Sequence, residues 1–221
     1  MSVVDSTLHV ARPTRSAAWL DTLQVLTGAG LVLFMWSHMI LVSSVLLGEW
    51  AMDGLAYFFE ATFMAQVGGP VIFAVMLFHF LLAARKMPFR FSELTAFWKH
   101  SKLMRHTETW LWLVQVGTAL VILVLGSIHM WTVLTDLPIS AQKSAARIQS
   151  GWWLVLYLFL LPMVELHVGI GFFRIGVKWG FIKRRDRSKM KRFENGLTLV
   201  FVAIGLLTLL RFLFITLVTQ Q

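Results

Sequence analysis

The stretch 30–48, GLVLFMWSHMILVSSVLLG, decides the fold, because His38 is the one ionisable side chain in a long apolar run. Three further apolar stretches each enclose one histidine: PVIFAVMLFHFLLAA (70–84), GTALVILVLGSIHMWTVL (117–134) and WLVLYLFLLPMVELHVGIG (153–171). An imidazole in hydrocarbon leaves its nitrogens without water, so an intramembrane histidine is by default a functional-site hypothesis. One histidine on each of four helices predicts axial ligands that hold two haems between helices, as in a membrane electron carrier.

The composition supports a membrane protein. Apolar residues make up 57% of the 221 residues, which is more than a soluble domain of this size usually carries. A membrane span needs about 20 predominantly apolar residues, and long runs without alternation favour helices over a barrel. We therefore predict one all-α membrane domain over residues 1–221. Its five transmembrane helices are expected at roughly 22–47, 66–84, 109–134, 152–173 and 196–218, with an interfacial helix at 48–65.

The chain contains no cysteine. This excludes a disulfide framework, iron–sulfur ligands and a C-x-x-C-H site for covalent haem attachment. Any haem is therefore expected to be held non-covalently, and any iron–sulfur cluster to belong to a partner. The first apolar run is too long for a cleavable signal and lacks a small-x-small cleavage site, so we expect it to remain as an anchor.

The formal net charge of +9 is distributed unevenly along the chain. Most of the 20 Lys and Arg fall in three segments: before the first span, between the second and third, and between the fourth and fifth. Arg12 and Arg15 form the first of these groups. All three segments lie on one side of the membrane, so the positive-inside rule predicts a cytoplasmic N-terminus and an outer C-terminus. The placement indicates contact with anionic lipid and no nucleic acid as a partner.

Orientation converts sequence position into depth at about 1.5 Å per residue. His38 and His129 lie on outward-running helices and fall in the outer half. His79 and His167 lie on inward-running helices, each seven residues before a cation at the inner end, Lys86 and Arg174. This predicts two bis-histidine sites at two levels of the membrane.

These histidines have three alternative interpretations. A single histidine on an apolar helix face is more often a hydrogen-bonded core residue, but four that fall into two level pairs are rarely accidental. One tetrahedral zinc site needs all four histidines at one depth. A haem-free proton-coupled transporter remains an alternative, although such proteins usually carry more intramembrane carboxylates. Gly126 and Gly171, each on the face of its histidine, leave room for a porphyrin plane or serve ordinary helix packing.

Five motifs together resemble the dihaem cytochrome b subunit of bacterial quinol:fumarate reductases, the five-helix anchor of the succinate:quinone oxidoreductase superfamily. The motifs are SHMILVSSVLLGE (37–49), LLAARKMPF (81–89), HSKLMRHTETWLW (100–112), LGSIHMWTVLT (125–135) and VELHVGIGFFRIGVKWGF (164–181). The resemblance runs from about Leu20 to Phe212, and His38, His79, His129 and His167 fall on its four haem-ligand positions.

The resemblance implies two haem b groups, menaquinol as the electron donor, an iron–sulfur subunit and a flavoprotein subunit with covalent FAD, in the bacterial inner membrane. It allows a dimeric complex and either reaction direction, fumarate reduction or succinate oxidation. It places Gln24, Trp112 and Lys178 around the inner haem and implies that Glu165 moves protons. A dihaem cytochrome b of another dehydrogenase or a hydrogenase is the main alternative function.

Quinol oxidation releases protons, so its site needs a base close to an electron acceptor. Glu60 lies just before the second span, near the level expected for His38 and His129. It also matches the glutamate that the family uses in menaquinol oxidation. We therefore predict Glu60 as the proton acceptor, with Glu49 and Asp53 as the next candidates.

Overall fold

The computed structural model describes residues 14–88, 90–104 and 107–217. Within this part of the chain, five helical rods are long and apolar enough to cross a membrane: Arg15–Leu46, Met64–Ala84, Thr107–Leu134, Trp152–Lys178 and Arg184–Leu213. The described residues form helices and turns and contain no strand. The predicted all-α bundle of five spans is thereby confirmed. Arg12, one of the basic residues before the first span, lies outside the described residues.

The rods are built from the following elements. The α-helices are α1 (Arg15–Ser43), α2 (Glu49–Ala61), α3 (Gly69–Ala84), α4 (Phe91–Met104), α5 (Thr107–Val121), α6 (Ser127–Leu134), α7 (Ala141–Gln149), α8 (Trp152–Lys178) and α9 (Arg187–Leu213). Short 3₁₀ turns, η1 (Ser44–Leu46) and η4 (Arg184–Asp186), and π-helical turns, η2 (Met64–Gly68) and η3 (Ile122–Gly126), connect or extend them.

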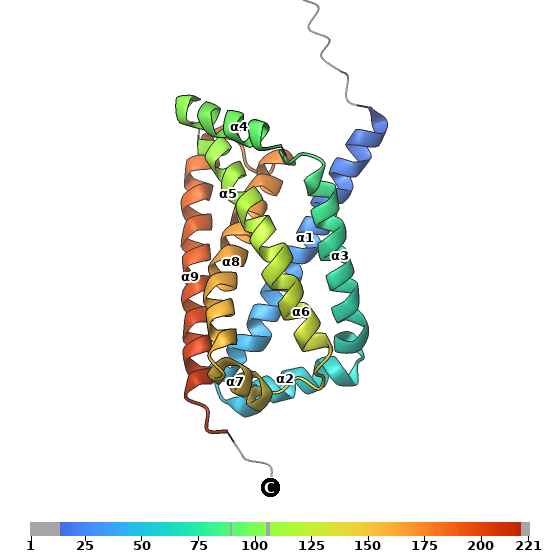
Figure 1. Ribbon diagram of the computed structural model, residues 1–221, viewed down its shortest axis with the longest axis vertical. Helices are drawn as coiled ribbons and strands as arrows, with labels where there is room; N and C mark the ends of the chain where they lie inside the picture. The colour runs from blue at the N-terminus through green and yellow to red at the C-terminus, as the bar shows by residue number, and fades with distance from the viewer. Residues whose placement is uncertain (1–13, 89, 105–106, 218–221) are drawn as a thin grey trace, which may run out of the picture.

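The spans enclose a central space. Helices α1 and α3 pack together on one side and α8 and α9 on the other, while α5 and its continuation α6 cross between them (Figure 1). Helices α2 and α7 lie across the end where α1, α6 and α9 finish, which we name the α2–α7 end. Helix α4 lies across the opposite end, the α4 end (Figure 1). The interfacial helix expected at 48–65 corresponds to α2.

Two helices extend beyond the apolar runs that predicted them. Helix α1 begins at Arg15, where the Thr14 hydroxyl accepts a hydrogen bond from the amide of Ala17 at 3.3 Å as an N-cap. The last span was expected over 196–218, but α9 runs from Arg187 to Leu213, so 195–196 lies inside the helix. The reason is that intrahelical hydrogen bonds continue into the interface, where long basic side chains reach water.

The α2–α7 end has its own packed core. Val45 and Ala145 are fully buried and Met52 is 1% exposed, and they pack with Ile148 of α7 and Phe212 of α9. Burying these apolar side chains fixes α2 and α7 against the ends of the spans. This end of the bundle is therefore closed by the chain itself.

Candidate functional site

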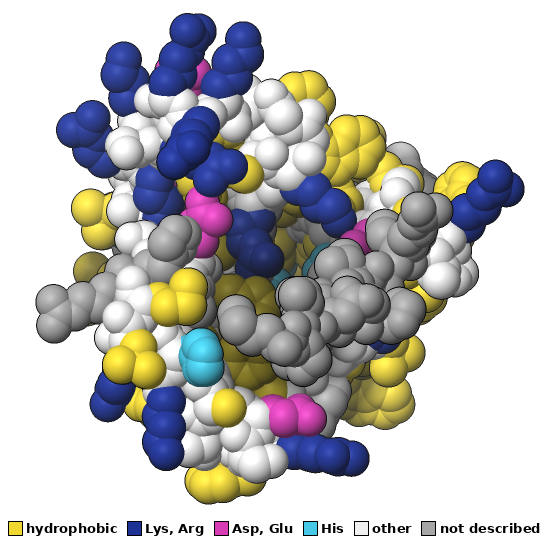
Figure 2. Space-filling view, turned by 90° about the horizontal axis from the view of Figure 1, so that it is seen from above, with side chains coloured by type: hydrophobic (Ala, Val, Ile, Leu, Met, Phe, Trp, Pro, Cys, Tyr) yellow, Lys and Arg dark blue, Asp and Glu magenta, His cyan; other side chains and the backbone are white. Residues whose placement is uncertain are grey.

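A cavity of about 1690 Å³ occupies the centre of the bundle, which is more than the roughly 300–1,000 Å³ of a pocket for one small ligand. All four intramembrane histidines line it: His38 from α1, His79 from α3, His129 from α6 and His167 from α8. Seen from the α4 end, the molecule is hollow at this position, with hydrophobic walls and Lys and Arg side chains around the opening (Figure 2). The fold thus gathers side chains that lie far apart in the sequence.

His38 and His129 form the pair nearer the α2–α7 end. Their ring centroids are 5.9 Å apart and their planes are inclined by 61°. A metal ion held about 2 Å from a nitrogen of each ring places the two centroids roughly 6 Å apart. The spacing therefore suits one metal ion between the two rings. The ring of Phe34 stacks on His38, with centroids 5.8 Å apart.

In the other pair, His79 and His167, each Nδ1 atom forms a hydrogen bond with a neighbouring helix. His79 Nδ1 lies 2.9 Å from the Thr27 hydroxyl, and His167 Nδ1 lies 3.1 Å from the Thr118 hydroxyl. The Thr27 hydroxyl also donates to the carbonyl of Leu23 at 2.8 Å, so its lone pairs are free to accept from His79.

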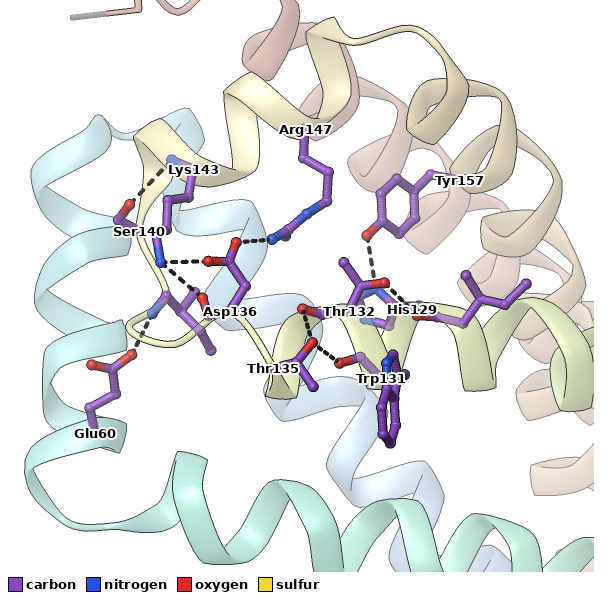
Figure 3. Close-up of polar contacts among 12 residues, drawn as sticks. Glu60, His129, Trp131, Thr132, Thr135, Asp136, Ser140, Lys143, Arg147 and Tyr157 are labelled. Carbon is purple, nitrogen blue, oxygen red and sulfur yellow. Dashed lines mark hydrogen bonds and ion pairs between the residues drawn. The ribbon is translucent and has the colours of Figure 1, made fainter. Parts of the chain in front are cut away.

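For His167 the tautomer follows from a second contact, because its Nδ1 also lies 3.2 Å from the carbonyl oxygen of Gln115. A carbonyl can only accept a hydrogen bond, so Nδ1 must carry the proton. In a neutral imidazole this leaves a lone pair on Nε2, the usual arrangement of a histidine that binds a metal. His129 Nδ1 also has a partner, the hydroxyl of Tyr157 at 2.8 Å, which is able to donate or to accept (Figure 3).

Glycines let the helix backbones lie close to the side chains that line the cavity. A Cβ added to Gly28 would lie 2.9 Å from Cε1 of His79, and one added to Gly171 would lie 3.3 Å from the amide nitrogen of Gln115. Gly126, which lies in the π-helical turn before His129, also lines the cavity. Gly126 and Gly171 were predicted beside their histidines, whereas Gly28 was not predicted. Gly28 could have been found from the sequence as a glycine next to Thr27, about three helical turns before His38.

Polar side chains line the cavity at the α4 end. Gln24, Trp112 and Lys178, predicted to surround one haem, are all in the cavity wall. The side-chain oxygen of Gln24 is buried and has no hydrogen-bond partner among the described residues, which marks a place for a polar group from outside the chain. Lys86 and Arg174 join this wall and were not predicted there.

Asp21 holds the cations of the α4 end together. Its carboxylate lies 2.7 Å from Nζ of Lys86, 3.3 Å from the Arg85 guanidinium and 3.6 Å from Nζ of Lys178. Arg174 instead donates to the side-chain oxygen of Gln115 at 2.7 Å. The wall therefore carries more positive than negative charge, as the binding of an anionic group requires.

The α2–α7 end carries a similar but smaller cluster around Asp136. Its carboxylate lies 2.9 Å from Nζ of Lys143 and 2.7 Å from the Arg147 guanidinium, and all three residues line the cavity (Figure 3). The hydrogen bond from Lys143 holds the pKa of Asp136 below its ordinary value, aided by the charges of Lys143 and Arg147. These residues were not predicted as part of a site, because sequence alone does not show that α7 folds over the cavity.

The acidic residues of α2 bind one segment of the chain. Glu60 accepts from the amide of Ile139 through Oε1, Asp53 accepts from the amide of Ala141 at 2.7 Å, and Glu49 accepts from the side chain of Gln142 at 2.6 Å. Near the end of α2, Phe59 and Thr62 line the cavity, whereas Glu60 is not among the described lining residues. Glu60 thus stands beside the cavity, against the loop between α6 and α7 (Figure 3).

Glu165 lies in α8, two residues before His167, and its exposed fraction is 5%. It belongs to the cavity wall and makes no hydrogen bond with any described residue. Two residues correspond to about 200° around a helix, so Glu165 and His167 lie on different faces of α8. The structure places it where α8 separates the cavity from α9.

A five-span helical bundle around a histidine-lined cavity defines a multi-pass membrane protein with a buried cofactor site. The model of the succinate dehydrogenase/fumarate reductase transmembrane subunit family matches residues 92–211. The chain is 37% identical over 201 residues to the fumarate reductase cytochrome b subunit of Helicobacter pylori, covering 86% of this chain and 78% of that protein. It is 36% identical over 210 residues to the fumarate reductase cytochrome b subunit of Wolinella succinogenes, covering 89% and 82%.

The chain therefore belongs to the family of membrane-anchor cytochrome b subunits of fumarate reductase. It is one subunit of an oxidoreductase complex in the bacterial inner membrane. A cytochrome b subunit implies haem b. The cavity fits that group. Its histidines have hydrogen-bonded Nδ1 atoms, Gly28 lies against the imidazole ring of His79, and cations line both ends. The buried side-chain oxygen of Gln24 has no hydrogen-bond partner among the described residues.

Proposed function

We propose that the chain is a dihaem anchor that oxidises menaquinol near the α2–α7 end and delivers electrons at the α4 end for fumarate reduction. His38 and His129 would hold the outer haem, and His79 and His167 the inner one. Haem b supplies reversible one-electron transfer when it is bound. The observation that carries the proposal is that histidines from four spans line one cavity, where the ring centroids of His38 and His129 lie 5.9 Å apart. Three of the four have Nδ1 hydrogen-bonded to a neighbouring helix.

The cations of the cavity wall suit the propionates that haem b carries. At the α4 end, Lys178 would neutralise one of them, with Lys86 and Arg174 as further partners and with Gln24 and Trp112 beside the ring. At the α2–α7 end, Lys143 and Arg147 would have the same task. An ammonium or guanidinium is attracted to a carboxylate most strongly where water is excluded.

Glu60 is proposed as the base that accepts protons from quinol. Oxidation of one quinol to the quinone releases two electrons and two protons, and a base within reach of the hydroxyl groups promotes that release. Oε1 of Glu60 is occupied by the amide of Ile139, while Oε2 makes no hydrogen bond with a described residue. Oε2 is the atom we assign to the quinol. Asp53 and Glu49 remain the next candidates.

Glu165 is proposed to transfer protons rather than to bind haem. A buried carboxyl group in a membrane helix is costly unless it serves a function. Its place in the wall of the cavity allows exchange with groups on both sides of α8.

The α4 end is proposed to face the cytoplasm. Lys and Arg side chains gather there (Figure 2), as the positive-inside rule requires of cytoplasmic segments. The iron–sulfur subunit would dock at this end, next to the inner haem, and connect it to the flavoprotein subunit with covalent FAD that converts fumarate to succinate. The same arrangement serves succinate oxidation in reverse.

The haem content of the purified complex tests the proposal. Pyridine haemochrome analysis should give two protohaems per copy of this chain, and the reduced spectrum should show two b-type components. One haem per chain, or none, would overturn the pairing of the histidines.

A further inference from the structure

A second, much smaller void lies between α8 and α9, next to the large cavity, and Glu165 and Val168 line both. Its volume is about 10 Å³, close to the space that one water molecule needs. Its lining residues include two acids, Glu165 from α8 and Glu194 from α9, with Thr198 and with Trp36 from α1. The rest of the wall is glycine and apolar residues: Val168, Gly169, Phe172, Leu197 and Phe201. Two acidic residues beside one water-sized space between helices are unusual in a membrane bundle, where apolar packing would be more stable.

Glu194 is one of the most deeply buried charged residues described, with an exposed fraction of 2%. Its Oε2 forms an ion pair with Nζ of Lys191, one turn earlier on α9, and its Oε1 accepts from the Thr198 hydroxyl at 3.4 Å. Replacing a buried ion pair by apolar residues is often neutral or stabilising. We therefore expect the Lys191–Glu194 pair to have a role other than stabilising the fold.

The chain leaves room for this carboxylate on the neighbouring helix. A Cβ added to Gly169 of α8 would overlap both Oε1 of Glu194 and the Thr198 hydroxyl. Gly169 also lines the void. The α8 backbone can lie this close to α9, with Glu194 in its observed position, because residue 169 has no side chain.

Lys191 connects Glu194 to the surface at the α4 end. Its side chain is 20% exposed and lies over the ring of Phe173, with Nζ 5.7 Å from the centroid. Glu165, on the other side of the void, also borders the large cavity. Polar groups therefore follow one another from the large cavity, through the void and Glu194, to the α4 end.

We propose that Glu194 is a proton-conducting residue that links the void to the surface of the α4 end. The inference rests on the proposed quinol-oxidising function, which releases protons at one end of the bundle while fumarate reduction consumes two protons at the other. In each transfer the Glu194 carboxylate accepts one proton from the water-sized void and releases one proton beside Lys191. The carboxylate is thereby regenerated, and no bond other than O–H forms or breaks.

The test uses the complete complex in proteoliposomes, with fumarate reduction driven either by a naphthoquinol or by a dye that reduces the partner subunits directly. Glu194→Gln should lower the quinol-driven rate by about tenfold or more, leave the dye-driven rate unchanged and keep both haem bands. Glu194→Asp, which restores a carboxyl group, should recover most of the rate. Gly196→Ala, on the same helix where an added Cβ meets no atom within 4 Å, is the matched control and should behave as the wild type.

Two further measurements keep the test decisive if Glu194→Gln fails to assemble. Thr198→Val removes a hydroxyl that contacts Glu194 at nearly constant volume, and it should slow the quinol-driven rate alone. The reduced-minus-oxidised infrared spectrum of the wild type should contain a carboxyl band that Glu194→Asp shifts. A wild-type quinol-driven rate in Glu194→Gln or in Thr198→Val, an Asp variant as slow as the Gln variant, or no shifted band would overturn the inference. A wild type without two haems or without quinol-driven activity would instead overturn the proposed function.

Discussion

The two ends of the cavity differ although each carries one pair of histidines and one aspartate that binds cations. At the α2–α7 end, Glu49, Asp53 and Glu60 all bind the segment 139–142, and apolar side chains with almost no exposed surface pack behind them. At the α4 end, Phe91 and Leu103 of α4 are 85% and 80% exposed. The chain closes one end by itself and leaves apolar and basic surfaces uncovered at the other.

This difference matches the two tasks in the proposed function. A small lipid substrate needs a pocket whose shape the chain itself determines, which a packed lid provides. A partner subunit needs a surface with exposed apolar and charged groups, which the α4 end provides. Variants that change one end only should therefore affect one task only.

Loss of a histidine should have the largest effect and should be confined to one end. His38→Ala removes one ligand of the outer pair, and His79→Ala removes one ligand of the inner pair, so each variant should lose about half of the haem. Redox titration of the visible spectrum should show a different component missing in each. His100→Ala, on the exposed face of α4, is the control and should retain both haems. Loss of the same component in both variants would show that the two levels are assigned wrongly.

Replacement of Glu60 should affect the α2–α7 end alone. Glu60→Gln keeps an oxygen that can accept from the amide of Ile139 but removes the titratable group. Quinol-driven fumarate reduction should fall by about 100-fold, while dye-driven reduction should remain. Glu93→Gln, an exposed acid on α4, serves as the control. If both rates of Glu60→Gln stay at the wild-type level, Glu60 has only its structural bond to Ile139.

The spans and the approach of His38 to His129 could be predicted from the sequence because each depends on a regular quantity. Apolar runs of sufficient length define the spans, and the constant rise of a helix gives the depth of each histidine. The contacts of the histidines could not be predicted in the same way. Thr27 lies 52 residues from His79 in the sequence, and their contact depends on the rotation of α1 relative to α3. Hydrophobicity does not determine that rotation when a helix is apolar all round.

Glu60 illustrates the other limit of the sequence. Its place before the second span fixes its level, but its bond to Ile139 depends on how the loop between α6 and α7 folds back. The cluster around Asp21 has the same origin, because it joins α1 to Lys86 and Lys178, which are distant in the chain. Asp136 instead pairs with Lys143 and Arg147, 7 and 11 residues further along, and depends on the turn that leads into α7. Helix ends were misplaced for a simpler reason, since α9 continues from the apolar run into a basic segment with good helix formers.

The hydroxyl groups beside the histidines should have smaller and unequal effects. Tyr157→Phe removes the partner of His129 Nδ1, so the outer haem should bind about tenfold more weakly. Thr118→Val should change the inner haem less, because the carbonyl of Gln115 still accepts from His167 Nδ1. Haem titration and the midpoint potential of each component measure both effects. Thr132→Val, whose hydroxyl donates to its own helix at Ile128, is the control. A larger effect for Thr118→Val than for Tyr157→Phe would contradict the assigned partners.

The cluster at Asp136 should give the smallest effect, visible as a dependence of stability on pH. The hydrogen bond from Lys143 lowers the pKa of Asp136 from its ordinary value of 3.8. An acid whose pKa is lower in the folded state stabilises that state above the unfolded-state pKa, and the stabilisation is lost as the pH falls through the folded-state pKa. Asp136→Asn should therefore lower the thermal midpoint by about 1–3 °C at neutral pH, because an exposed pair contributes little. Below pH 3.8 the difference between variant and wild type should shrink.

The midpoint is best followed through the absorbance of the outer haem, which lies next to this cluster in the proposed function. Asp186→Asn, which breaks an exposed pair with Arg185 at the α4 end, is the matched control and should leave that signal unchanged. A difference between Asp136→Asn and the wild type that grows as the pH falls would have the wrong sign for a lowered pKa. It would show that groups other than Lys143 and Arg147 determine the pKa of Asp136.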